Sequence, residues 1–432
     1  MKSQKIITFF SHKFTKRILE IIVILFIALI AGMLSMFAAY SIPISKIQAH
    51  VTESIDILEN ESDSYGFAPR VSTSYPDHIT DALMICEAVA PRTASVIDDA
   101  INANWISLDS YNNVQTLINA FGKGMYDKTT VTPYPRYWHG YLIFLKPLLA
   151  CMSYSEIRIL AMWVQLALLC LAIHELLKKD RKLAIAFFTS FLFLNPITSA
   201  LSIQYASIYC ITLLFTIILV RYNVYLSEKC WILFMIAGIS TAFFDLLTYP
   251  VVALGIPLII FTALTSEMGI RKNIKKIFEH SLSFSIGYAG MWGGKWIIAS
   301  LFTDNNTIDN AISQISYRMT AEESSQPLTV TYVLRQVLMH LNNKPMKIFV
   351  LMFALIVFLS LLCQKRIVVI SKNIIPMLLI ALYPFAWYIL VRNHSATHSR
   401  LEQRELAVTI MALIFSVLIN LKPKALSHHI SK

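Results

Sequence analysis

Long apolar runs recur along the whole sequence and constrain the fold more than any other feature. The first run, Ile18 to Tyr40, is long enough to cross the ~30 Å hydrocarbon core of a bilayer as a helix. Of the 432 residues, 56% are hydrophobic and only 15% are charged, which argues against an ordinary soluble enzyme. Because helices satisfy their own backbone hydrogen bonds in lipid, the sequence predicts an all-α polytopic membrane protein.

Further apolar segments bring the expected number to about ten transmembrane helices in a single membrane domain, residues 1–432. A shorter segment, Tyr141 to Met152, contains Lys146 and is expected to lie at the interface or to re-enter the membrane. The expected spans after the first are Tyr154–Leu177, Leu183–Leu201, Tyr205–Val220, Trp231–Phe244, Val251–Thr265, Ser281–Phe302, Met346–Leu362, Ile375–Val391 and Leu406–Leu421.

Basic residues indicate the orientation of these spans. Lys13, Lys16 and Arg17 precede the first span, and Lys178, Lys179, Arg181 and Lys182 follow the second. Short loops rich in Lys and Arg stay in the cytoplasm, so we expect a multi-pass protein of the cell membrane with both termini cytoplasmic. The net charge of +11 follows from the same rule and does not indicate a nucleic acid partner. The six cysteines form no CxxC pair, which argues against a zinc site.

Two segments are too polar to span a bilayer and too long to be turns. Residues 41–138 and residues 303–344 are therefore expected to be extracytoplasmic loops. The second contains amphipathic stretches around Tyr317 and over Val333 to Leu341. Because long loops with their own structure are usually functional, we expect the first loop to form a structured cap with a role in the chemistry.

Two acidic residues of the first loop, Asp77 and Asp81, are candidates for a general base. They are four residues apart and share a face if Pro76 opens a helix. Asp81 also precedes an apolar stretch that can dock at the membrane surface, where a base must be partly shielded. Asp56 and Glu53, close to the first span, are rival acids. The alternative is that the aspartates are helix caps or solvated charges.

A basic cluster lies late in the chain, on the expected outer side between the last two spans. His394 and His398 are spaced i, i+4, as are Arg400 and Arg404. The planar guanidinium of Arg binds phosphate oxygens in bidentate fashion, so the cluster predicts an anion site. The alternative is a solvated turn that meets lipid headgroups. A histidine metal site has less support because no carboxylate or Cys spacing accompanies it.

Arg136 and His139 lie among aromatic residues at the end of the first loop, in Tyr-Pro-Arg-Tyr-Trp-His-Gly-Tyr. This composition fits an aromatic belt at the bilayer edge and a platform for sugar and phosphate equally well.

Asp245 and Lys295 are charges within or beside apolar runs. Such charges are costly in lipid, so each is expected to face the protein interior or a wet cavity. They are candidates for a substrate role, with a structural ion pair between them as the alternative. Four glycines close to Lys295 are expected to allow close helix packing rather than to bind a ligand. They are Gly287, Gly290, Gly293 and Gly294.

Acids in an outer cap above a cavity with Arg, His and Lys suit group transfer from a lipid-linked phosphate to a hydroxyl acceptor. The base takes the acceptor proton, and cations stabilise the charge that develops on the departing phosphate. The sequence has no GxxxxGK[ST] or GxGxxG motif, which fits a donor carried by the membrane rather than a nucleotide.

The layout resembles the GT-C superfamily of polyprenyl-phosphate-sugar-dependent glycosyltransferases, over nearly the whole length as architecture. The resemblance depends on the Asp77 and Asp81 segment, the Arg136 to Tyr141 segment, the Phe-Phe-Asp-Leu-Leu-Thr-Tyr-Pro segment with Asp245, and the His394 to Arg404 cluster. It implies a bacterial cell-envelope transferase that moves a sugar to a glycan or other hydroxyl acceptor. We predict inversion at the anomeric carbon, because one base and one phosphate clamp suffice for direct displacement. The resemblance further implies Asp81 or Asp77 as the base, with Arg400, Arg404 and His398 contacting the lipid phosphate.

Two other classes stay open. An O-antigen ligase or polymerase also combines many spans with a long outer loop, although that loop usually comes late in the chain. A secondary transporter is expected to have inverted repeats and charged sites near the midplane, for which Asp245 and Lys295 are the only candidates. No cofactor is certain. A divalent metal is possible at the acidic cluster, although no ligand spacing demands it.

Overall fold

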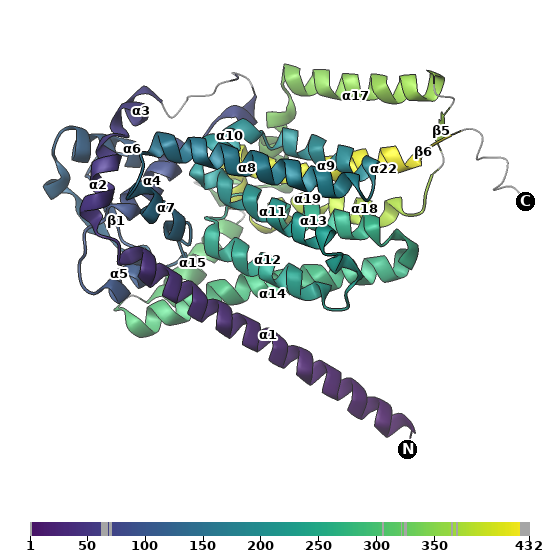
Figure 1. The fold of residues 1–432 in the computed structure, drawn as a ribbon, viewed down its shortest axis with the longest axis horizontal. Coiled ribbons are helices and arrows are strands. Elements are labelled where there is room, and N and C mark those ends of the chain that lie inside the picture. Colours follow the sequence, from purple (N-terminus) through teal and green to yellow (C-terminus); the bar gives the residue numbers. More distant parts are fainter. Residues whose placement is uncertain are drawn as a thin grey trace, which may run out of the picture.

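The computed structural model describes residues 2–423, apart from 62–67, 69–70, 305, 321, 324–325, 364–365 and 369. Helices dominate, and the described strands form only three two-stranded pairs, which confirms the all-α class. The expected cytoplasmic C-terminal tail, residues 424–432, lies outside the described residues. We name residues 41–138 the first outer loop after their expected location. Figure 1 shows its short helices gathered at one end, with the start of α1 (Lys2–Tyr40) toward the other.

The first outer loop is structured where it is described, as expected. Its helices bury Ile47, Val51 and Ile85 in one apolar core with residues of α1 and of the following segment, residues 141–152. The described part of this loop contains one antiparallel strand pair, in which Trp105 lies opposite Thr132. The elements are α2 (Ile44–Thr52), α3 (Ile55–Asn60), η1 (Ser72–Ser74), α4 (His78–Ala88), α5 (Val96–Asn102), β1 (Trp105–Ser107), α6 (Asn113–Leu117), η2 (Ile118–Gly122), η3 (Tyr126–Lys128), β2 (Thr130–Thr132) and α7 (Leu142–Leu149).

A bundle of long apolar helices follows, and its core contains Phe187, Tyr209 and Phe261. Figure 1 shows these helices running roughly side by side across the molecule. The helices are α8 (Tyr154–Leu177), α9 (Arg181–Phe193), α10 (Pro196–Leu201), α11 (Ile203–Arg221), η4 (Val224–Leu226), α12 (Cys230–Phe244), α13 (Pro250–Leu264), η5 (Ser266–Met268) and α14 (Ile270–Phe302).

Glycines bring α14 close to its neighbours, as predicted. A Cβ atom on Gly287 would lie 2.1 Å from the Met235 carbonyl oxygen of α12, and one on Gly294 would lie 2.2 Å from a methyl carbon of Leu29 in α1. Gly290 faces Leu25 of α1 in the same way. Gly293 is different, because a Cβ atom there would meet nothing within 4 Å. Three of the four glycines therefore serve close helix packing.

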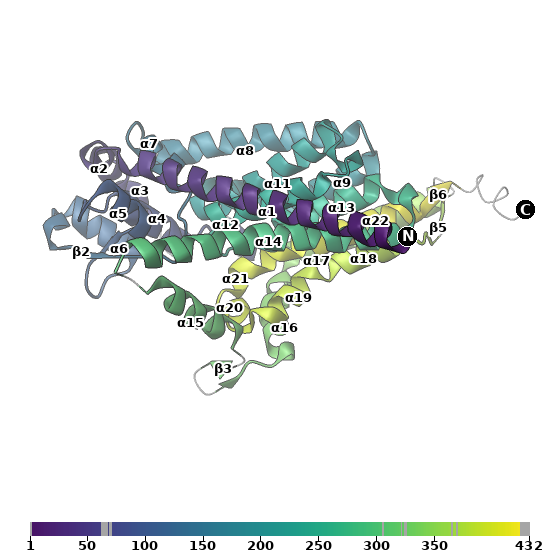
Figure 2. The ribbon, with the colours of Figure 1, turned by 90° about the horizontal axis from the view of Figure 1, so that it is seen from below.

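The last part of the chain contains residues 303–344, which we name the second outer loop after their expected location, and the closing helices. The amphipathic stretches around Tyr317 and Val333 do form helices, as expected. Figure 2 shows α15, α16 and α20 projecting together from one side of the bundle, and Figure 1 shows α17 lying apart from it. The elements are α15 (Thr307–Met319), β3 (Glu322–Glu323), β4 (Gln326–Pro327), α16 (Val330–Leu338), η6 (Met339–Leu341), α17 (Lys344–Cys363), β5 (Arg366–Val368), α18 (Ile374–Ala381), α19 (Tyr383–Leu390), α20 (Arg392–Thr397), α21 (Ser399–Glu402), η7 (Gln403–Glu405), α22 (Leu406–Asn420) and β6 (Leu421–Pro423).

Four of the described helices are long and apolar enough to cross a membrane, which fits a membrane protein. They cover Phe14–Tyr40, Tyr154–Leu177, Ile203–Arg221 and Lys344–Leu362, and three shorter apolar helices accompany them. The segment expected as a span over Leu183–Leu201 is not one continuous helix, because Asn195 at φ 60° and Pro196 separate α9 from α10. The span expected over Ile375–Val391 is likewise divided into α18 and α19, next to Pro384.

Candidate functional site

Asp81 is fully buried, and its carboxylate closes the N-terminus of α11. It accepts the backbone N–H groups of Ile203 at 2.9 Å and Gln204 at 2.8 Å. It also accepts the hydroxyl groups of Tyr154 at 2.6 Å and Ser202 at 3.1 Å. A carboxylate has about four lone-pair positions, so these four donors use all of them. Burial raises the pKa of Asp81 to about 6, against the opposing effect of these hydrogen bonds.

Asp77 lies outside α4 as its N-cap, rather than sharing a helix face with Asp81. Its carboxylate accepts the backbone N–H of Thr80 at 3.1 Å and the hydroxyl of the same residue at 2.7 Å. The side chain is only half-buried. Two of about four lone-pair positions are used, so Asp77 has acceptor capacity that Asp81 lacks. The rival acids Asp56 and Glu53 are exposed on α3 and directly after α2.

The segment before Asp77 contacts the late basic cluster directly. The buried guanidinium of Arg404 donates to the carbonyl oxygen of Thr73 at 3.2 Å and lies 3.8 Å above the ring of Tyr205. The exposed Arg400 lies over the ring of Tyr75, with 4.8 Å between guanidinium carbon and ring centroid. The structure therefore brings the acidic outer loop and the arginines of the late cluster together.

His340 bridges the same two segments. Its Nδ1 lies 2.9 Å from the Ser72 hydroxyl, and its Nε2 lies 3.1 Å from the Ser399 hydroxyl. Burial and the charges of Arg400 and Arg404 lower the pKa of His340, so the imidazole is held neutral. His340 could not be predicted from the sequence, because a lone His in an amphipathic loop segment gives no signal.

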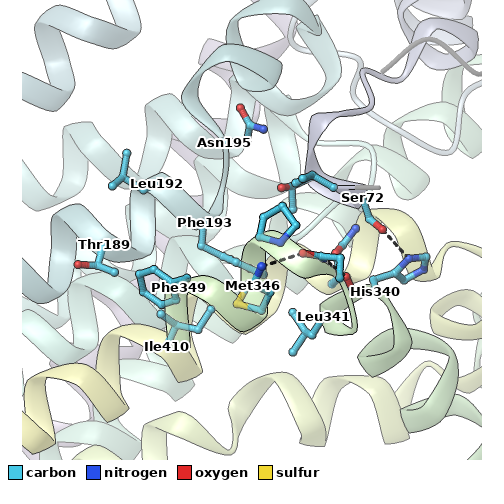
Figure 3. A pocket seen from close by; sticks show the side chains of 15 residues that line it. Ser72, Thr189, Leu192, Phe193, Asn195, His340, Leu341, Met346, Phe349 and Ile410 are labelled. Carbon is cyan, nitrogen blue, oxygen red and sulfur yellow. Dashed lines mark hydrogen bonds between the residues drawn. The ribbon is translucent and has the colours of Figure 1, made fainter. Parts of the chain in front are cut away.

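A cavity of about 200 Å³ opens beside this bridge. One end is polar, where the Ser72 hydroxyl points to His340 and Asn195 lies nearby (Figure 3). The other end is apolar and is formed by side chains of α9, α17 and α22, among them Leu192, Phe349 and Ile410. A ligand with a polar head and an apolar tail matches this division in chemistry.

Asp245 lies in a strained turn after α12. Leu247 adopts φ 66°, a left-handed conformation that is costly for leucine. The Asp245 carboxylate accepts the backbone N–H of Thr248 at 2.9 Å and also its hydroxyl group. Burial raises the pKa of Asp245 to about 6, although the Thr248 hydrogen bonds favour the charged form.

His394 connects this turn to the second outer loop. Its Nε2 lies 3.0 Å from the Leu247 carbonyl oxygen, and its Nδ1 lies 3.2 Å from Nη1 of Arg318. A guanidinium can only donate, so Nδ1 accepts from Arg318, and the proton on Nε2 faces the Leu247 carbonyl oxygen and the Glu402 carboxylate, 3.3 Å away. The exposed ring of His398 lies 4.7 Å from that of His394, as the i, i+4 spacing predicts.

His139 and Lys295 serve buried contacts rather than an open site. His139 is paired through Nδ1 with the Glu87 carboxylate at 3.0 Å, and its Nε2 lies 2.9 Å from the Tyr134 carbonyl oxygen. Lys295 donates to the Ile101 carbonyl oxygen at 2.7 Å and thereby caps the end of α5. The ion pair between Lys295 and Asp245, weighed as an alternative, does not form in the described part of the chain.

Arg136 has a neutral partner from the second outer loop. Its Nη1 donates to the side-chain oxygen of Asn310 at 2.6 Å, and its guanidinium lies over the Tyr134 ring. The predicted basic residues therefore lie in different places. Arg400 and Arg404 contact the segment before Asp77, and His394 contacts the turn after Asp245. Among the described residues, no group of three or more His, Cys, Asp or Glu could hold a metal ion.

Comparisons of the chain with protein-family models, with curated proteins and with solved structures find no match. The chemistry of the site therefore rests on its own geometry.

Proposed function

We propose that the protein is a membrane glycosyltransferase of the GT-C type, which transfers a sugar from a polyprenyl-phosphate donor to a hydroxyl of a cell-envelope glycan or similar acceptor. One observation carries the proposal. Residues 72–77 of the outer loop and residues 399–404 of the late basic cluster contact each other beside one cavity, through Thr73 with Arg404 and through His340.

The roles follow from exposure and hydrogen-bond capacity. Asp77 is the general base, because it is accessible and retains unused lone pairs, whereas Asp81 is saturated as a helix cap. The acceptor oxygen bonds to the anomeric carbon as its proton passes to Asp77. The bond from that carbon to the phosphate oxygen breaks on the opposite side, and the phosphate leaves with the electron pair. This single displacement inverts the anomeric configuration.

The phosphate and the lipid have separate places in this proposal. Arg400 is exposed above Tyr75 and stabilises the departing phosphate, while buried Arg404 holds the Thr73 segment in place. The hydrocarbon chain lies toward the apolar end of the cavity, between α9 and α17.

We further propose that about ten segments span the cell membrane with both termini cytoplasmic, the broken helices α9–α10 and α18–α19 counting as one span each. Cysteines introduced at Ser227 and Ser95 test the orientation, because the first is expected inside and the second outside. Labelling of intact cells with a membrane-impermeant maleimide is expected at position 95 alone. Labelling at position 227 alone would show that the orientation is the reverse of the one proposed.

The decisive experiment for transfer compares Asp77→Asn with Asp56→Asn in detergent-purified protein supplied with a polyprenyl-phosphate sugar. Loss of at least about a hundredfold in kcat is expected for Asp77→Asn alone, which is the usual contribution of a general base. Full activity of Asp77→Asn would show that Asp77 is not the base, and retention of configuration in the product would reject the single displacement.

A further inference from the structure

A second polar site lies away from the cavity, where residues 134–137 meet α14 and α15. It contains two arginines from different loops, Arg136 of the first and Arg318 of the second. The side-chain groups that accept their hydrogen bonds are an amide oxygen of Asn310 and an imidazole nitrogen of His394. Among the described ion pairs, neither arginine faces a carboxylate.

The two guanidinium groups lie against one pair of tyrosine rings. Arg136 lies 5.1 Å from the centroid of Tyr134, Arg318 lies 5.9 Å from that of Tyr137, and the two rings are 5.4 Å apart. Both arginine charges also oppose the rise in pKa that burial causes at Tyr134 and Tyr137. Both arginine charges thus act on one pair of tyrosines, and the carboxylates of Glu87 and Asp245 also act there without an ion pair to either arginine among the described ones. Guanidinium groups outside an ion pair are available for the charge-assisted hydrogen bonds of an anionic ligand.

Aromatic rings of α14 extend this pair into a shelf. Trp292 lies edge-on to Tyr137 with centroids 5.2 Å apart, and it stacks on Tyr288 at 5.5 Å. The Tyr288 hydroxyl and the Trp292 indole nitrogen are both buried and have no hydrogen-bond partner among the described residues. Aromatic faces can pack against a sugar ring, and hydrogen-bond donors without a partner at their edges can bind its hydroxyl groups.

We propose that Arg136, Arg318 and the shelf of Tyr137, Tyr288 and Trp292 form a binding site for an anionic saccharide, a sugar that bears a phosphate or a carboxylate. His394 positions Arg318, since its Nδ1 accepts the guanidinium N–H while its Nε2 is fixed by Leu247. Whether the saccharide acts as a transfer substrate rests on the proposed function, whereas its binding does not.

Equilibrium dialysis of the full-length, detergent-purified protein tests the site, with hexose 1-phosphate as probe and the neutral hexose as comparison. The phosphorylated sugar is expected to bind and the neutral sugar to bind at least about tenfold more weakly, because the charge-assisted hydrogen bonds are lost. Arg318→Gln and Arg136→Gln are each expected to weaken binding of the probe about tenfold.

Arg335→Gln is the matched control, since Arg335 is an exposed arginine on α16 of the same outer loop. It is expected to leave binding unchanged. If Arg318→Gln fails to fold, Arg318→Lys keeps the charge and removes the planar fork, and weaker binding is again expected. Equal binding of the neutral and phosphorylated sugars, or unchanged binding in folded Arg318 and Arg136 variants, would overturn the site.

A short-chain alkyl phosphate distinguishes the source of the ligand. Displacement of the probe by alkyl phosphate, lost in Arg318→Gln, identifies the headgroup of a lipid donor, and resistance to displacement identifies an anionic acceptor. Both results support the site. A protein that binds the probe through Arg318 but shows no transfer would refute the proposed function alone.

Discussion

The carboxylate of Asp81 lies 2.8 Å from the backbone nitrogen of Gln204, so an acid of the first outer loop caps a helix that begins far later in the chain. The same device recurs at Glu405, whose Oε1 accepts the backbone N–H of Val251 at 3.0 Å in the first turn of α13. Carboxylates at helix N-termini are favoured by the unpaired N–H groups and by the helix dipole. Both acids therefore serve the fold.

Asp81→Asn is expected to destabilise the protein by about 3 kcal/mol or more, because the amide nitrogen cannot accept two of the four donors and leaves them buried without a partner. Thermal unfolding in detergent measures the loss. Asp56→Asn, at an exposed position of α3, should melt with the wild type. A melting temperature of Asp81→Asn equal to that of the wild type would contradict the capping role.

Asp245 predicts a pH dependence of stability. Its pKa is about 6 in the folded protein against an ordinary value of 3.8, so the folded state binds this proton more tightly than the unfolded chain. As pH rises from about 4 to about 6, the free energy of unfolding of the wild type should fall by about 3 kcal/mol relative to that of Asp245→Asn. Above about pH 6 the difference between the two proteins should stay constant. Melting temperatures of both proteins across this range provide the check, and parallel curves would exclude the raised pKa.

Gly287→Ala is expected to destabilise the contact between α12 and α14, because the new methyl group would overlap the Met235 carbonyl oxygen. The cost should be about 1–3 kcal/mol, as for other overpacked sites. Gly293→Ala is the matched control on the same helix, since its methyl group meets open space. It should be neutral or stabilise by up to about 1 kcal/mol through helix propensity. Equal melting temperatures for the two variants would argue against the packing role.

Substitutions of Arg400 and Arg404 should have different effects on stability and on activity. Arg404→Lys loses the fork that spans the carbonyl oxygens of Thr73 and Arg400, and a lower melting temperature is expected. Arg400→Gln should keep its melting temperature, because the side chain is exposed, while the KM for a polyprenyl-phosphate sugar rises about tenfold. A rise in KM for Arg404→Lys alone would exchange the roles of the two residues.

Apolar run length predicted most of the long helices, because burial in lipid demands an uninterrupted helix. It failed over residues 183–201, where Asn195 takes a left-handed conformation and its side chain accepts from Thr198, so that α10 starts anew. The length of an apolar run does not reveal such a break in the helix, since apolar residues continue on both sides of it. The i, i+4 spacing of His394 and His398 did place their rings together, because one helical turn fixes that relation.

The contacts of the candidate site could not be predicted from the sequence, because they join residues that are far apart in the chain. Asp81 and Asp77 are similar loop aspartates in sequence, and only the position of α11 distinguishes a saturated cap from a half-exposed acid. Arg318 gave no signal of its own, since an arginine on an amphipathic loop helix is ordinarily a solvated charge. Its relation to His394 depends on the folding of the second outer loop over the turn at Leu247.

The capping of α13 by Glu405 has a consequence for biogenesis. The N–H groups that open α13 receive their acceptor from a residue synthesised 154 positions later. The first turn of this helix therefore receives that acceptor only after residue 405 has been translated, and a product truncated before Glu405 would leave the Val251 N–H without it. Quality-control proteases are expected to find their substrate there.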